Sequence, residues 1–129
     1  MKIKKTLVDM FIRIKNNSQN YKKSVEIIKT KPNIKLLKFL YDEGYISGYS
    51  FSNNKSKMFV YLKYQNSEPL IKNLNFILKP NKEIYCSVKT LSQHKNNNSF
   101  YVLYTQKGYK SIMDAKLQNL GGLLICRIN

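Results

Sequence analysis

The sequence has no Trp, one His, two Cys, one Ala and only seven carboxylates among its 129 residues. Two Cys are too few for a disulfide-rich secreted scaffold. No apolar run approaches the roughly 18 to 20 residues that span a bilayer, which excludes an integral membrane protein. Scarce His, Cys and acidic side chains leave little for catalysis or metal binding. The sequence therefore predicts a binding protein that is not an enzyme, with no cofactor, no metal and no small-molecule substrate.

The few residues that could carry chemistry do not form a recognisable site. His94 stands beside Lys95 and a run of Asn, without a Cys or a second His at ligand spacing. Cys86 and Cys126 lie in separate apolar runs, where buried free thiols are the usual arrangement. Asp42 and Glu43 are adjacent at a predicted helix end and do not suggest a general acid and base.

The charge indicates the class of partner. The chain carries 23 Lys and Arg against seven Asp and Glu, a formal net charge of +16. Solubility needs a net charge of only about 2 to 8 in a small domain. A polyanion would relieve the resulting self-repulsion, and nucleic acid is the first candidate, with an anionic membrane surface second. The basic residues extend from Lys2 to Arg127, which favours a multi-sided contact over a single basic arm.

The choice of basic residue carries a separate signal. Arg13 and Arg127 are the only Arg residues, and Asn occurs 15 times. Lys, Asn, Ile, Tyr and Phe have AT-rich codons, so the composition indicates an AT-rich genome. Residues 1–5 are too short and polar for a signal peptide and lack the features of a transit peptide. We therefore expect an organelle-encoded protein of a mitochondrial ribosome; a plastid, or the cytosol of an AT-rich organism, is the alternative.

The sequence of the amino-terminal half, residues 1–65, predicts the element order α-β-α-β-β. Leu7, Met10, Phe11 and Ile14 follow helical spacing and predict a helix over residues 4–17. A strand over 24–29 follows, and then a helix that Pro32 opens and Gly44 ends as a left-handed cap. Residues 45–51 and 58–64 read as two further strands.

The sequence of the carboxy-terminal half, residues 66–129, predicts a mainly antiparallel β lobe with a short helix. Residues 70–78 and 83–88 predict a hairpin joined by a turn at residues 79–82. A helical turn over 89–93 and a loop over 94–98 come next. A strand over 99–104, a turn at 105–108, a helix capped by Ser111 and a closing strand over 123–128 complete the chain. The fold class is therefore α+β with two small lobes, and we expect the second lobe to bind RNA.

The turn from Thr105 to Gly108 is the strongest local candidate for a site. It places a hydroxyl, an amide and an ammonium between an aromatic strand and the start of a helix. Gly108 permits positive φ and a close backbone approach. Such a place suits phosphate and sugar contacts. The alternative is an ordinary polar turn that caps a helix.

The motifs of the chain resemble the small-subunit ribosomal protein S8 family from residue 6 to residue 129. The opening helix contains Asp9-Met10 and then Arg13-Ile14-Lys15-Asn16. Leu40 to Ile46 is similar to the family's step from helix to strand, Leu-x-x-Glu-Gly-(Phe/Tyr)-Ile. Further motifs follow in family order: Leu62-Lys63-Tyr64, Lys79-Pro80, Ile84-Tyr85, the turn Tyr104 to Gly108, and the ending Leu120-Gly121-Gly122-Leu123-Leu124-Ile125-Cys126.

The resemblance implies a two-lobed α+β protein that binds the central domain of small-subunit rRNA and supports platform assembly and translation. Its implied protein partners are neighbouring small-subunit proteins, especially the family-five protein. The RNA-binding residues that we predict are Thr105, Gln106, Lys107, Gly108, Lys110, Ser111, Tyr85, Lys4, Lys5, Arg13, Lys15, Asn16, Lys31, Lys79 and Lys82.

Several positions depart from the family pattern and leave the RNA hydrogen bonds open. Tyr104 and Gln106 replace the two Ser of the turn, and Leu123 replaces the Glu that commonly follows the Gly pair. The principal alternative function is a general basic RNA- or DNA-binding module outside the ribosome. A helix-turn-helix protein and a small enzyme each lack the sequence features that those classes need. A membrane-surface protein would need a helix with one basic and one bulky apolar face, which the first predicted helix resembles.

Overall fold

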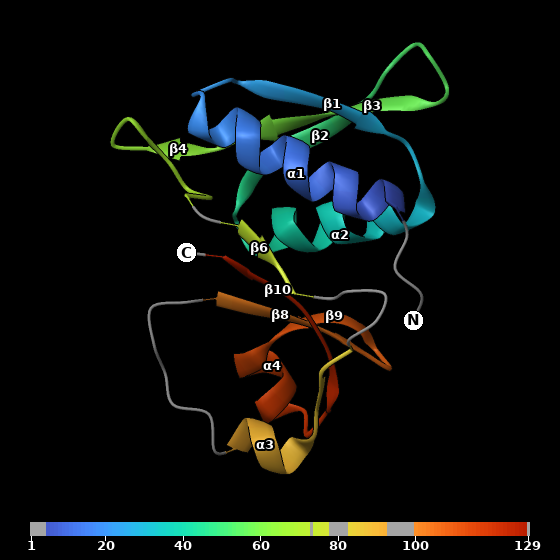
Figure 1. Ribbon diagram of the computed structural model, residues 1–129, viewed down its shortest axis with the longest axis vertical. Helices are drawn as coiled ribbons and strands as arrows, with labels where there is room; N and C mark the ends of the chain where they lie inside the picture. Colours follow the sequence, from blue (N-terminus) through green and yellow to red (C-terminus); the bar gives the residue numbers. More distant parts are fainter. Residues whose placement is uncertain (1–4, 73, 78–82, 93–99, 129) are drawn as a thin grey trace. The chain divides into compact units, whose positions relative to one another are not determined.

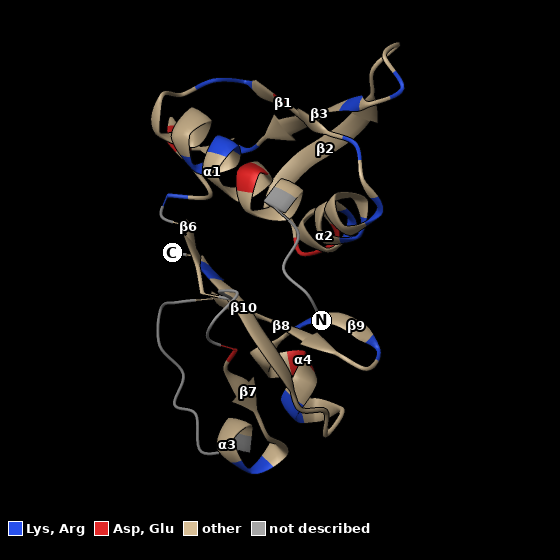
Figure 2. Cartoon of the chain, turned by 45° about the vertical axis from the view of Figure 1, so that its right-hand side comes forward, with Lys and Arg blue, Asp and Glu red and all other residues tan. Residues whose placement is uncertain are grey.

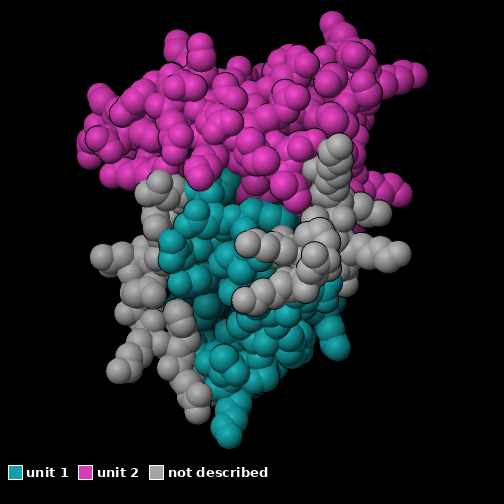
Figure 3. All heavy atoms as spheres, viewed as in Figure 1, with its two compact units in different colours: residues 1–3, 73–129 teal, residues 4–72 magenta. Residues whose placement is uncertain are grey.

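The computed structural model describes residues 5–72, 74–77, 83–92 and 100–128 of the chain. These residues belong to two compact units, one of residues 4–72 and one that contains residues 73–129 (Figure 3). The expected boundary lay after residue 65, whereas these units divide after Lys72. The segment in between stays with the first unit, because Leu70 donates a backbone hydrogen bond to Lys63 and Ile71 is buried.

The amino-terminal unit has the predicted order α-β-α-β-β (Figure 1). Its elements are α1 (Lys5–Gln19), β1 (Ser24–Ile28), α2 (Lys31–Asp42), β2 (Ile46–Phe51) and β3 (Lys57–Leu62), followed by the short strands β4 (Tyr64–Gln65) and β5 (Glu68–Pro69). The first three strands form an antiparallel sheet in the order β1-β3-β2. Val25 pairs with Val60 and Ile27 with Met58, so one face of the sheet is apolar and buried.

The two helices form because each carries one apolar stripe and a clear stop. Leu7, Met10, Phe11 and Ile14 of α1 are at most 2% exposed, which confirms the predicted helical face. In α2 the Thr30 hydroxyl caps the first turn by accepting from the backbone N–H of Asn33 at 3.3 Å, and Pro32 lies inside that turn. Gly44 follows α2 with φ of 82°, as predicted for a left-handed helix stop.

The carboxy-terminal unit is an antiparallel sheet with two short helices (Figure 1). Its elements are β6 (Leu74–Phe76), β7 (Tyr85–Cys86), α3 (Val88–Ser92), β8 (Phe100–Thr105), β9 (Gly108–Ser111), α4 (Ile112–Leu117) and β10 (Gly122–Ile128). The order is β6-β10-β8-β9, and β7 also pairs with β10. Leu91, Leu103, Ile112 and Ala115 form a buried cluster between the helices and the sheet. The α+β fold class is confirmed.

The predicted hairpin between residues 70–78 and 83–88 is wrong. Instead, β6 and β7 lie end to end along the same edge of β10, Leu74 opposite Ile128 and Tyr85 opposite Leu123. The backbone of Ile77 donates to Ile125 at 2.8 Å, and that of Leu124 donates to Ile84 at 2.9 Å. The two segments are therefore one interrupted edge strand. The prediction failed because a Pro-containing turn predicts a reversal without identifying which strand is the partner.

In the part of the chain that the structure describes, no helix is long and apolar enough to cross a membrane. Within the same residues, no group of three His, Cys, Asp or Glu side chains could hold a metal ion. The predicted turn at residues 79–82 and the predicted loop at residues 94–98 both lie outside the described residues.

Candidate nucleic-acid interface

The predicted turn lies at the tip of the hairpin between β8 and β9. Thr105 pairs with Gly108 across the two strands, and Gln106 and Lys107 project from the tip, both exposed. Gly108 has φ of 99°, whereas Gln106 and Lys107 do not have positive φ. This is the pattern of a type I turn closed by a glycine bulge. The glycine is needed for its backbone conformation, because a Cβ built there would have nothing within 4 Å.

Thr105 has a different role from the one its hydroxyl suggested. The side chain is 4% exposed. Its Oγ1 donates to the carbonyl oxygen of Gly108 at 2.9 Å and accepts from the backbone N–H of Lys107 at 3.1 Å. Both bonds lie within the turn, so Thr105 fixes the turn that presents Gln106 and Lys107.

Ser111 is also used inside the fold. As predicted, it caps α4, and its Oγ accepts from the backbone N–H of Asp114 at 3.2 Å. The residue is 5% exposed, and Asp114 places a carboxylate in the first turn of the helix. Lys110 lies one residue earlier on β9, opposite Leu103, and is partly exposed. The cation of Lys110 is thus a better candidate for an anion contact than the helix terminus.

An aromatic row crosses the sheet beside this turn. Tyr85, Leu123, Tyr104 and Tyr109 are successive cross-strand partners on β7, β10, β8 and β9, so they share one face. Tyr85 is 66% exposed. The rings of Tyr104 and Tyr109 meet edge to face, with centroids 5.0 Å apart. Burial, and then the nearby Tyr104, raise the pKa of Tyr109, so its hydroxyl is neutral at physiological pH.

The sequence reasoning identified Tyr85 but missed Tyr109 as part of this surface. The signal was present, because Tyr104 and Tyr109 stand symmetrically about the Gln106-Lys107 tip. Residues placed so in a hairpin become direct cross-strand neighbours. The departures that we noted at Tyr104 and Leu123 fall in the same row, so this chain has an apolar surface where the family pattern is polar.

The Gly121-Gly122 pair lets the strands approach closely. A Cβ at Gly121 would lie 2.8 Å from the carbonyl oxygen of Cys86 and 2.9 Å from the hydroxyl of Tyr85. One at Gly122 would lie 2.5 Å from the carbonyl oxygen of Tyr104. A real Cβ atom essentially never lies closer than 3.0 Å to such a neighbour, so both positions require glycine for space. The missing side chains thereby leave room for the backbone of Cys86 and Tyr104 and for the ring of Tyr85.

The remaining predicted contacts lie in the amino-terminal unit or outside the described residues. Arg13 on α1 donates from Nη1 to the carbonyl oxygen of Glu26 at 3.3 Å, which ties the helix to β1. Lys15 is partly exposed, and Asn16 and Lys31 are exposed. Lys5 begins α1. Lys4, Lys79 and Lys82 lie outside the described residues. The predicted residues therefore form two groups, one on each unit, with the charges shown in Figure 2.

Comparison with known proteins identifies the family. The family model described as ribosomal protein S8 matches residues 5–129. The protein named small ribosomal subunit protein uS8 of Brucella ovis is 36% identical over 131 residues, covering 99% of each chain. That of Rhizobium leguminosarum bv. trifolii is 36% identical over 125 residues, covering 95% of each chain.

These relatives correct the predicted location. We expected a mitochondrial ribosome, whereas the relatives are bacterial uS8 proteins, which point to the cytoplasmic ribosome of a bacterium. The error has a simple cause. AT-rich codon usage reflects mutational bias in any genome, so the abundance of Lys and Asn carries no information about the compartment.

Proposed function

The chain belongs to the ribosomal protein S8 family, and from this premise we propose that it binds small-subunit rRNA directly as a component of the small ribosomal subunit in translation. The family is one of ribosomal proteins and not a class of enzymes. We further propose the central domain of that rRNA as the binding site and platform assembly as the role. The neighbouring family-five protein is the proposed protein partner.

One observation carries the RNA-binding part of this proposal. The exposed tip Gln106-Lys107 is held by the two hydrogen bonds of Thr105 and lies beside a row of aromatic side chains. A preformed turn loses little conformational entropy on binding. Lys107 supplies the charge for phosphate, Gln106 supplies both donors and an acceptor, and exposed Tyr85 supplies a ring for a base or a ribose.

The basic surface of the amino-terminal unit is the second proposed contact. Arg13, Lys15 and Lys31 are cations on two successive helices, and Asn16 adds an amide. Double-stranded RNA is recognised mainly through its shape, its phosphates and its 2′-hydroxyl groups. Lysines that contact phosphate without selecting a base suit this type of recognition.

Binding to a central-domain rRNA fragment at several salt concentrations tests the proposal. If roughly five phosphates are neutralised, log affinity falls with log salt at a slope of about −3 to −5. We expect Lys107→Ala to weaken binding and to reduce the magnitude of the slope by about one. Lys55→Ala, in the exposed loop between β2 and β3, is the matched control and should leave both quantities unchanged.

Two outcomes would contradict the proposal. A salt-independent affinity would remove the electrostatic contact with phosphate. Equal affinity for unrelated RNA hairpins of the same length would support the alternative, a general basic RNA- or DNA-binding module outside the ribosome. That alternative requires charge alone, whereas our proposal requires the fixed tip at Gln106-Lys107.

A further inference from the structure

Helix α1 ends in a way that does not suit its sequence. The backbone N–H of Lys22 donates to the carbonyl oxygen of Asn17 at 3.0 Å, and that of Tyr21 donates to Ser18 at 3.2 Å. This pair of bonds is the Schellman motif, in which the residue after the cap is left-handed. Tyr21 holds that position with φ of 57°. A bulky side chain is strained there, and glycine is the usual residue.

Two other helices provide an internal comparison. Helix α2 ends with the same two hydrogen bonds, and Gly44 takes the left-handed position with φ of 82°. Helix α4 does the same with Asn119 at φ of 54°. Gly and Asn are the residues that adopt this conformation most readily. Of these three helices, α1 alone has a large aromatic residue at the left-handed position. The need to end the helix therefore does not explain why Tyr stands there.

The ring of Tyr21 is both exposed and supported. It is 60% exposed and stacks on the ring of Tyr64, with centroids 6.1 Å apart and planes 18° apart. The hydroxyl of Tyr64 donates to the backbone carbonyl of Lys22, so the ring of Tyr64 is itself held to the loop that carries Tyr21. Stacking on Tyr64 covers one side of Tyr21 and leaves more than half of the residue in contact with solvent.

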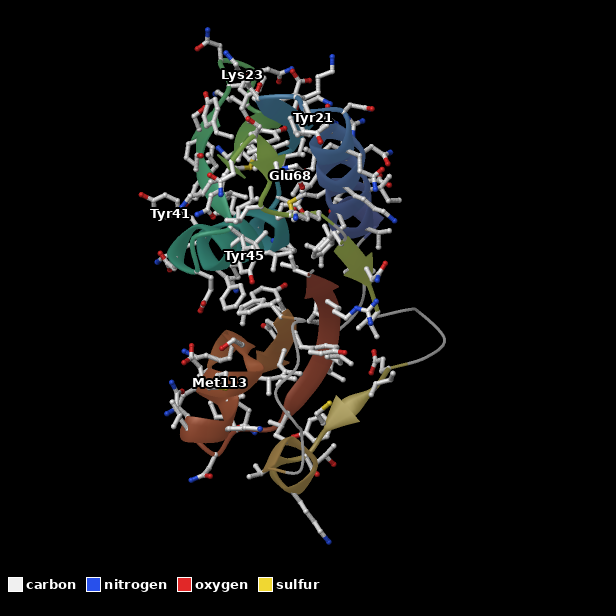
Figure 4. The ribbon with its side chains drawn as sticks, turned by 90° about the vertical axis from the view of Figure 1, so that its left-hand side faces the viewer. Tyr21, Lys23, Tyr41, Tyr45, Glu68 and Met113 are labelled. Atoms are coloured by element: carbon white, nitrogen blue, oxygen red, sulfur yellow. The ribbon has the colours of Figure 1, made fainter. Side chains whose placement is uncertain are left out.

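The surroundings of the two rings are cationic. Residues 13–24 contain Arg13, Lys15, Lys22 and Lys23 and no carboxylate. Lys22 and Lys23 are exposed in the loop between α1 and β1, which is blue in Figure 2. Lys63, also exposed, directly precedes Tyr64. Figure 4 labels Tyr21 and Lys23, which share this loop.

We propose that Tyr21 and Tyr64 form a stacking platform for one unpaired nucleotide base of RNA, with the cations of Lys22, Lys23 and Lys63 near the phosphates on either side. Aromatic rings beside a cationic backbone track are the usual means of binding single-stranded nucleic acid. The backbone strain at Tyr21 is then explained by a ring that serves binding and not folding. The proposal rests on the proposed function for the identity of the polymer, and it adds a site in the amino-terminal unit.

The competing explanation is that the Tyr21 ring only fastens the loop to Tyr64. The variant Tyr21→Gly separates the two, because it removes the ring and the strain together. We expect the unfolding free energy of Tyr21→Gly to be unchanged or higher. We expect its affinity for an oligouridylate of about eight nucleotides to fall at least fivefold, the effect of losing one base stack. Tyr21→Phe should bind the oligouridylate as the unmodified chain does.

Two further arms complete the test. Tyr61→Ala removes an exposed tyrosine from β3 of the same unit and should leave the affinity for oligouridylate unchanged. Ultraviolet crosslinking of the bound oligonucleotide, read by mass spectrometry, should label Tyr21. Unchanged affinity in Tyr21→Gly would overturn the proposal, and so would a loss of stability that accompanies the loss of binding.

Failure of the stacking site can be distinguished from failure of the proposed function. If Tyr21→Gly binds oligouridylate normally while Lys107→Ala still weakens binding to the rRNA fragment, only the stacking site is wrong. If the rRNA fragment is not bound specifically but Tyr21→Gly still loses oligouridylate, the stacking site stands and the ribosomal target is wrong.

Discussion

The side-chain hydroxyl of Thr105 and the backbone carbonyl of Gly108 are joined by a hydrogen bond of 2.9 Å across the tip of the β8–β9 hairpin. The same hydroxyl accepts from the backbone N–H of Lys107, so its donor and one acceptor site are both occupied. In the proposed RNA contact, the contribution of Thr105 is therefore indirect, through the turn that it holds. Gln106 and Lys107 are the residues that can reach a partner.

Replacing Thr105 tests this indirect role. Thr105→Val keeps the shape but leaves a buried site without its hydroxyl, and we expect it to lower the unfolding free energy by about 1 to 2 kcal/mol. Affinity for the rRNA fragment should fall as the tip loses its fixed conformation. Thr105→Ser retains the hydroxyl and should keep most of the unfolding free energy and most of the affinity for the rRNA fragment. Urea denaturation and RNA titration of the two variants give the measurement; equal behaviour of Val and Ser would contradict the role.

A second prediction concerns the space that Gly122 leaves for its neighbour. A Cβ there would lie 2.5 Å from the backbone oxygen of Tyr104, and backbone atoms cannot move aside as the end of a side chain can. We expect Gly122→Ala to destabilise the chain by about 1 to 3 kcal/mol, the usual cost of overpacking. Gly48→Ala is the matched control, because a Cβ at Gly48 would meet nothing within 4 Å. A thermal melt in which both variants match the unmodified chain would refute this explanation of the Gly pair.

The amino-terminal fold was readable from the sequence because its signals are local. The apolar spacing of α1, the cap and proline of α2 and the stop at Gly44 are each formed by residues a few positions apart in the sequence. The pairing of β6 and β7 could not be predicted from the sequence, since the partner of a strand depends on residues far away in the chain. Nothing near Leu74 or Tyr85 indicates that both pair with β10.

The same distinction holds for the candidate site. Sequence reasoning located the Thr105 to Gly108 turn and the N-cap role of Ser111, because turn and cap chemistry is local. It could not show that the hydroxyl of Thr105 forms its hydrogen bonds within the turn. It also missed Tyr21, since a Tyr in a polar loop gives no sign of positive φ. Backbone conformation at a single residue follows from the hydrogen bonds around it, which the structure supplies.

The last prediction concerns alkaline pH and the two free thiols. Cys126 is fully buried, whereas Cys86 is partly exposed, and both are free. Desolvation by burial raises the pKa of Cys126 above its ordinary value of 9.0, and it raises that of Cys86 in the same direction. Burial and Tyr104 raise the pKa of Tyr109 as well. A raised pKa in the folded state means that the folded chain binds these protons more tightly than the unfolded chain.

The stabilisation from Cys126 is therefore complete below pH 9 and is lost progressively as the pH rises above it. We expect the unfolding free energy from urea titrations to be flat between pH 7.5 and 8.5 and to fall between pH 9 and 10. Each thiol that ionises only on unfolding contributes a slope of up to about 1.4 kcal/mol per pH unit. Cys126→Ala should make this fall shallower, and Cys86→Ala, the control, should change it less. An equal slope in Cys126→Ala and in the unmodified chain would show that the thiol of Cys126 does not govern stability at alkaline pH.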